Sequence, residues 1–122
     1  MSLKKEINSA IAMHSMWKSR LERCVDTGTF DTPVDIVELD SECYFGKWLY
    51  SDDLAPAVRV SAEFKRVKEY HAKFHRVAAR VVQLSLAGKK QEAANLMLWD
   101  GEYTRATTEL IGELTSWAEH VD

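Results

Sequence analysis

Apolar side chains recur at alternating intervals of four and three residues near the start of the chain. This spacing is typical of a helix that packs lengthwise along a partner. It predicts a helix over about residues 3–26, and Gly28 suits the turn that follows a helix. The series consists of Leu3, Ile7, Ala10, His14, Trp17, Leu21 and Cys24.

Two later segments carry similar patterns. A series with steps of four and three predicts a helix from about Pro56 to Ala87, because proline suits a first helical turn and Gly88 can end the helix. Its members are Val60, Phe64, Val67, His71, Phe74, Ala78, Val81 and Ser85. A sevenfold series predicts a last helix from about Lys89 onward. It comprises Leu96, Tyr103, Leu110 and Trp117.

Two glycines, Gly101 and Gly112, lie inside that last helix. Either allows a kink or a close contact between helices, and Gly112 is alternatively a mere weak spot. Residues 29–40 have no regular period and contain Pro33, so we predict a connection there. Asp40 or Ser41 can then cap a short helix that ends near Leu49.

These elements predict the all-α class. We expect one domain, residues 1–122, built as an antiparallel helical bundle of three long helices plus a short helix that carries Cys43. A lone three-helix core of this size is small, so we expect a homodimer formed through a spare apolar face. Trp99 is out of phase with the last helix's apolar face and is a candidate for that surface, although it is alternatively a partly exposed aromatic residue.

Composition narrows the function. The net charge is −3 and the sequence pI is about 5.8, which gives no broad attraction to nucleic acid or to an anionic membrane. No stretch approaches the roughly 20 apolar residues of a membrane span. The first ten residues lack the apolar core of a signal peptide, so we expect a cytoplasmic protein. In a reducing compartment Cys24 and Cys43 should not be assumed to form a disulfide.

Three of the four histidines lie on or beside the apolar stripes. His71 and His75 are four residues apart, so their imidazoles project from one helix face about one turn apart. Such a pair is the usual helical half of a metal site. His14 occupies the apolar stripe of a different helix, and an antiparallel neighbour could bring all three rings together.

Cys43 would complete a ligand set. We place it in the first turn of the short helix, where free backbone N–H groups and the helix dipole favour its thiolate. Three imidazoles and a thiolate suit tetrahedral Zn(II). The alternative is that His14, Cys43, His71 and His75 are buried packing residues, and spacing alone leaves both interpretations open.

The two remaining candidates are interpreted differently. Cys24 lies ten residues beyond His14 on the same stripe, about 15 Å along a helix axis, which is too far to share its metal. We therefore favour packing for Cys24. His120 lies near the end of the last helix, where we expect an exposed side chain. Among the charged residues near Cys43, Asp40 and Glu42 could orient a ligand imidazole, and we prefer helix capping for Asp40.

Three sequence elements carry a family resemblance. His14-Ser-Met-Trp17, Cys43-Tyr-Phe-Gly-Lys-Trp-Leu49 and His71-Ala-Lys-Phe-His75, in this order, resemble the chemoreceptor zinc-binding (CZB) domain over nearly the whole chain. The element that begins at Cys43 is the specific part. The resemblance implies that His14, Cys43, His71 and His75 are the four zinc ligands.

The resemblance also implies a function. Family members are sensory modules, typically attached to chemoreceptors or diguanylate cyclases, and some are proposed to sense oxidants such as hypochlorous acid through the zinc-bound cysteine. We therefore expect a regulatory module that reports zinc, oxidant or both to a chemotaxis or cyclic-di-GMP signalling partner. The partner, and whether the chain stands alone or is an excised domain, stay open.

Two other functional classes compete with a sensory module. A closed site with four protein ligands offers no open position for water or substrate, and HExxH, paired ExxH and CxxCH elements are absent from the sequence, so we do not expect an enzyme. The second rival is a structural zinc-stabilised bundle that serves as a dimerisation or interaction module. Preference for Zn(II) over Co(II), Ni(II) or Cu(II) cannot be read from spacing.

Overall fold

Every regular element in residues 3–121 of the computed structural model, the part of the chain that the structure describes, is a helix. This confirms the all-α class. Three helices are long: α1 (Leu3–Thr27), α5 (Ala62–Leu86) and α7 (Glu102–Glu119). Four are short: α2 (Val34–Glu38), α3 (Tyr44–Leu49), α4 (Pro56–Arg59) and α6 (Lys90–Leu96).

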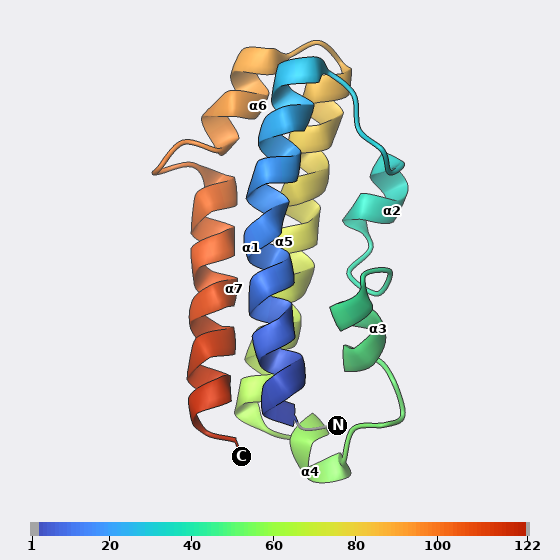
Figure 1. Ribbon diagram of the computed structural model, residues 1–122, viewed down its shortest axis with the longest axis vertical. Helices are drawn as coiled ribbons and strands as arrows, with labels where there is room; N and C mark the ends of the chain where they lie inside the picture. The colour runs from blue at the N-terminus through green and yellow to red at the C-terminus, as the bar shows by residue number, and fades with distance from the viewer. Residues whose placement is uncertain (1–2, 122) are drawn as a thin grey trace.

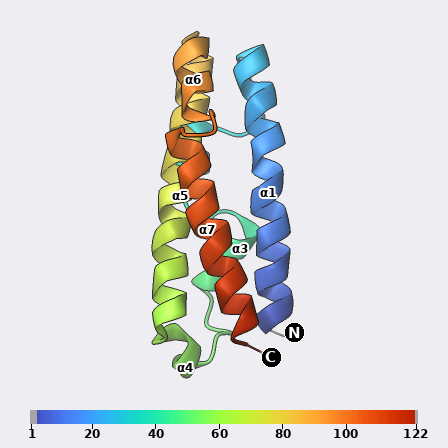
Figure 2. The same cartoon turned by 90° about the vertical axis from the view of Figure 1, so that its left-hand side faces the viewer.

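The long helices contact one another pairwise along the molecule. α1 and α5 run in the same direction, and α7 runs opposite to both (Figure 1). The second view shows α7 lying against α1 and α5 (Figure 2). Our prediction of an antiparallel arrangement throughout therefore differs from the structure. The reason is that residues 28–61 return along the length of the bundle, so that α5 begins at the end where α1 began (Figure 1).

The predicted apolar stripes form the core. On α1 the stripe is buried from Ile7 to Cys24, except that Trp17 is half-buried. On α5 the members of the predicted stripe from Phe64 to Ser85 are buried. On α7 the buried members are Tyr103, Leu110 and Trp117. Two predicted members are not buried: Val60, the residue after the short α4, is 69% exposed, and Leu96 is half-buried.

Two predicted helices are each divided in two. The side chain of Ser61 accepts a hydrogen bond from the Phe64 N–H, so Ser61 caps a new helix after α4. α6 and α7 are separated by residues 97–101, and this turn needs glycine at position 101, where a Cβ would come within 2.3 Å of the Leu96 carbonyl oxygen. Gly112 faces open space, so it makes no close helix contact.

The connection after α1 contains a helix that the sequence pattern missed. α2 follows Pro33 and buries Val37 against α5. α3 begins at Tyr44, later than predicted, because the Cys43 sulfur and not Asp40 accepts the hydrogen bond at its N-terminus. The capping role expected for Asp40 is therefore wrong. Its carboxylate instead accepts a 2.6 Å hydrogen bond from the Tyr50 hydroxyl.

Candidate metal centre

Four side chains from three elements converge inside the bundle. One donor atom from each of His14, Cys43, His71 and His75 lies within 4.8 Å of the other three. α1 contributes His14, α5 contributes both His71 and His75, and Cys43 is the residue before α3. The structure thus brings together all four residues that the sequence singled out.

The orientation of His14 is set within its own helix. Its Nδ1 is 2.8 Å from the carbonyl oxygen of Ala10, one turn earlier, so Nδ1 carries the hydrogen and donates it. The lone pair is then on Nε2. This atom is buried and has no hydrogen-bond partner among residues 3–121. A buried nitrogen lone pair without a partner is costly, which points to a bound ligand there.

His75 is oriented by the segment that carries Cys43. Its Nδ1 is 2.9 Å from the carbonyl oxygen of Val37 and donates to it. Its Nε2 therefore faces the cluster as an acceptor. A ring nitrogen held by a backbone carbonyl is the usual support of a metal-binding imidazole, because it fixes the tautomer and the ring plane.

His71 lies between the other donors. Its Nε2 is 3.3 Å from the Cys43 sulfur and 3.1 Å from Nε2 of His75. Its Nδ1 has no partner among residues 3–121, so packing holds this ring. The edge-to-face contacts with Phe45 at 5.2 Å and with His14 at 4.9 Å between ring centroids supply that packing.

Burial keeps the imidazoles neutral. It lowers the pKa of His14 to about 4 and the pKa of His71 to about 2, because a charged ring would lose its hydration. Burial also lowers the pKa of His75, while the Val37 hydrogen bond opposes that effect. A neutral imidazole is the form that binds a metal.

Cys43 is the half-buried member of the group, whereas the three histidines are at most 2% exposed. The Gly46 N–H donates to its sulfur at 3.3 Å, as we expected for a helix N-terminus. That contact lowers the pKa of the thiol, but burial outweighs it and raises the pKa above its ordinary value. The helix therefore does not by itself produce the thiolate, so binding of a cation must displace a proton.

The donor set fits a zinc ion. Tetrahedral zinc with Zn–N near 2.0 Å and Zn–S near 2.3 Å separates neighbouring ligand atoms by roughly 3.3–3.6 Å. The observed distances of 3.1 Å and 3.3 Å around His71 are already close to that spacing. The unpartnered Nε2 of His14 supplies the remaining nitrogen. His14, Cys43, His71 and His75 would hold the ion, and they would use every position of a tetrahedron.

Comparison with known families agrees with this geometry. A family model described as the chemoreceptor zinc-binding domain, CZB, matches residues 14–82. This range contains all four donors and more than half of the 122 residues. The chain belongs to the chemoreceptor zinc-binding domain family. Zinc is therefore its metal. No curated protein and no solved structure gave a match.

The CZB match begins at His14 and ends within α5, so it is narrower than the nearly full-length resemblance that the sequence suggested. The third long helix, α7, lies outside it. This helix nevertheless completes the core, because it contacts both helices that carry the CZB histidines.

Aromatic rings enclose the CZB donors. Trp17 meets the edge of His75 with 5.8 Å between centroids, and Phe74 meets His14 at 5.1 Å. Trp48 stacks on Phe45 at 5.6 Å, and Phe45 in turn contacts His71. Trp17 covers the site directly, whereas Trp48 lies behind Phe45.

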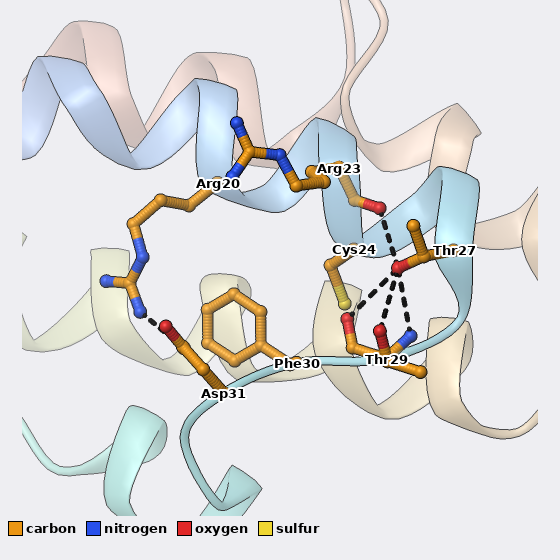
Figure 3. A pocket seen from close by; sticks show the side chains of 7 residues that line it. All are labelled: Arg20, Arg23, Cys24, Thr27, Thr29, Phe30 and Asp31. Carbon is orange, nitrogen blue, oxygen red and sulfur yellow. Dashed lines mark hydrogen bonds and ion pairs between the residues drawn. The ribbon is translucent and has the colours of Figure 1, made fainter.

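The other titratable candidates lie apart from the donors. Cys24 is 1% exposed and belongs to the core, in agreement with a packing role. Its neighbourhood is a separate pocket between α1 and the connection that follows it (Figure 3). His120 is exposed at the end of α7 and donates to the Ser116 carbonyl oxygen.

Several supports of the CZB site were missed by sequence reasoning. Val37 acts through its backbone carbonyl, which no side-chain pattern can reveal. Gly46 permits a close backbone approach, because a Cβ there would lie 1.7 Å from the carbonyl oxygen of Asp40. The hydrogen bond from Tyr50 to Asp40 joins residues ten apart in a loop without a repeating pattern.

Proposed function

We propose that this domain is a zinc-dependent sensory module whose His14, Cys43, His71 and His75 ligate one Zn(II). One observation carries the proposal. Three donors lie on two long core helices, whereas the fourth lies on a short and partly exposed segment. Zinc would tie that segment, residues 29–50, to the bundle, and loss of the tie would release it.

Two signals can remove the zinc link between residues 29–50 and the bundle. Zinc depletion removes the ion, and a two-electron oxidant removes the thiolate. With hypochlorous acid, the Cys43 sulfur attacks chlorine and hydroxide leaves. Water then replaces chloride to give the sulfenic acid, so that sulfur loses two electrons and chlorine gains them. A sulfenic acid is a poorer zinc ligand than a thiolate.

The output is a movement of residues 29–50 that a signalling partner in the cytoplasm detects, such as a chemoreceptor or a diguanylate cyclase. A homodimer of the three-helix bundle fits this role, and Trp99 is 86% exposed and available for such a contact. We assign no catalysis, because four protein ligands close the tetrahedron. No helix among the described residues is long and apolar enough to cross a membrane.

Metal analysis tests the proposal. We expect about one zinc per chain in protein purified without chelator. Cys43→Ala and His71→Ala should each weaken zinc binding by at least about 100-fold, since even supporting residues outside the ligand set are worth 10–100-fold. Cys24→Ala is the matched control and should keep its zinc. Folded wild-type protein that takes up no zinc would overturn the proposal.

A further inference from the structure

A small pocket leads from the surface to the metal-site residues. Its volume is about 190 Å³, and both Cys43 and His75 line it. Of the four donor residues, Cys43 is the one that retains partial exposure, whereas the histidines are at most 2% exposed. A reagent from solvent that enters this pocket therefore meets the ligand whose oxidation would release zinc.

The pocket has an apolar wall on one side. Ile36, within α2, and Leu39, the residue after it, line the pocket and are 38% and 47% exposed, so they lie at its rim. Trp17 of α1 lines it too and contacts His75. The carbonyl of Val37, between the two rim residues, holds His75, so the rim is anchored to the donor that it covers.

Arg20, which is held by ring contacts and paired with a carboxylate, forms the other edge of the pocket. The Arg20 guanidinium lies 4.4 Å from the Trp17 ring centroid and 4.8 Å from that of Phe30. It also pairs with Asp31 at 2.9 Å, and this reach across the connection is visible beside the Phe30 ring (Figure 3). Arg20 lines both this pocket and the one around Cys24, so it divides the two.

Apart from Arg20, the charged side chain at the pocket rim is acidic. Glu42 is exposed and lines it, and within residues 3–121 no ion pair to Glu42 is formed. Because Asp31 offsets Arg20, the Glu42 carboxylate leaves the rim with negative character. Such a rim disfavours anions relative to neutral molecules.

We propose that this pocket is the route by which small uncharged reagents reach the Cys43 sulfur, with Ile36 and Leu39 setting the size limit and Glu42 disfavouring anions. This inference rests on the proposed zinc site and adds the class of reagent that it admits. Neutral two-electron oxidants of a few atoms, such as hypochlorous acid and hydrogen peroxide, fit that class.

The test uses the zinc-loaded full chain carrying Cys24→Ala, so that Cys43 is the remaining thiol. Zinc content is measured first, and then the rate of Cys43 alkylation by neutral iodoacetamide and by anionic iodoacetate. Leu39→Trp should slow iodoacetamide severalfold, and Leu39→Ala should speed it. Val60→Trp adds the same bulk at an exposed site outside the pocket and should leave the rate unchanged.

Charge is tested separately from size. Glu42→Gln should raise the rate with iodoacetate severalfold and change the rate with iodoacetamide little. Hypochlorous acid, followed by zinc release, should rank the Leu39 variants as iodoacetamide does.

Distinct outcomes separate the two proposals. If the protein contains a full equivalent of zinc but neither Leu39 variant changes the rate of Cys43 alkylation, the pocket proposal is wrong and the zinc-site proposal is unaffected. The same conclusion would follow if the alkylation rate did not respond to Leu39 variants but rose in Tyr50→Phe, because residues 29–50 would then open as a whole. Absence of zinc in the folded starting protein would instead overturn the proposed function, and the pocket proposal with it.

Discussion

The metal-site donors come from two unlike regions. α1 and α5 are each 25 residues long, and their three donor histidines are at most 2% exposed. The region that carries Cys43, residues 29–50, contains helices of only five and six residues and exposes Leu39, Tyr44 and Tyr50. Small elements with little buried surface open more easily than long core helices. A metal here would therefore join the two long helices α1 and α5, the rigid region, to the less stable residues 29–50, which we call the strap.

Removal of zinc should have the largest effect on this comparison. At free zinc about 1,000 times the dissociation constant, binding stabilises the folded state by about 4 kcal/mol, and a chelator should remove that gain. Urea unfolding with and without chelator measures it. Cys43→Ala is the control, because its stability should respond much less to chelator. Equal stabilisation by zinc in that variant would contradict the ligand assignment.

Acidification should destabilise the metal-free protein by way of the rigid region. The pKa of His14 falls from 6.5 in the unfolded chain to about 4 in the fold, so the unfolded state binds more protons between those values. His14 alone should therefore contribute stability that is full above pH 6.5 and falls by on the order of 3 kcal/mol as pH drops toward 4. His71, whose pKa falls to about 2 in the fold, should add a loss of similar size over the same pH range.

Urea unfolding as a function of pH checks this sign. His14→Leu should make the profile shallower without flattening it, because His71 and His75 also have lowered pKa values. A metal-free stability that rises on acidification would show that the histidines are not buried as neutral groups.

Gly46→Ala should damage the strap selectively. The new Cβ would meet the backbone oxygen of Asp40 at 1.7 Å, and backbone cannot rotate away, so we expect a cost of about 1–3 kcal/mol. Zinc affinity should fall as well, because relieving this clash would displace the backbone N–H at residue 46 that donates to the Cys43 sulfur.

The matched control is Gly112→Ala. It makes the same change inside α7 where nothing lies within 4 Å, and should stabilise by about 0.5–1 kcal/mol through helix propensity. Thermal unfolding and zinc titration of the pair measure both effects. Equal behaviour of the two variants would mean that Gly46 does not lie against the Asp40 carbonyl as described.

The smallest effect is expected for Tyr50→Phe. This change keeps the ring beside Lys68 but removes the 2.6 Å hydrogen bond to Asp40, which is worth about 1 kcal/mol. Amide hydrogen exchange should quicken within residues 40–50 and stay constant in α1 and α5. Faster exchange throughout the bundle would show that the strap and the core unfold together.

The sequence revealed the rigid region better than the strap. Alternating steps of four and three placed His14 and His71 on buried stripes, and the spacing of four residues placed His75 beside His71, because helical periodicity reports which face is covered. It did not reveal that α1 and α5 run in the same direction. Helix direction follows from the path of the connection, and residues 29–55 have no period from which to read that path.

For the strap, the sequence indicated the chemically important residues but not the local structure. Cys43 and Gly46 were recognisable as residues, but the start of α3, the existence of α2 and the carbonyl contact from Val37 to His75 depend on tertiary packing. Helices of five or six residues have too few turns to show a periodic pattern. Every residue has a backbone carbonyl, so a contact made by one cannot be inferred from residue type.

Hydrogen exchange at residues 29–50, compared between metal-free and zinc-loaded protein, tests the central claim most directly. The account predicts that zinc slows exchange strongly there and least in α7, which carries none of the four donors. Exchange at residues 29–50 that is unchanged by one equivalent of bound zinc would contradict it, because the ion would then not tie the strap to the bundle.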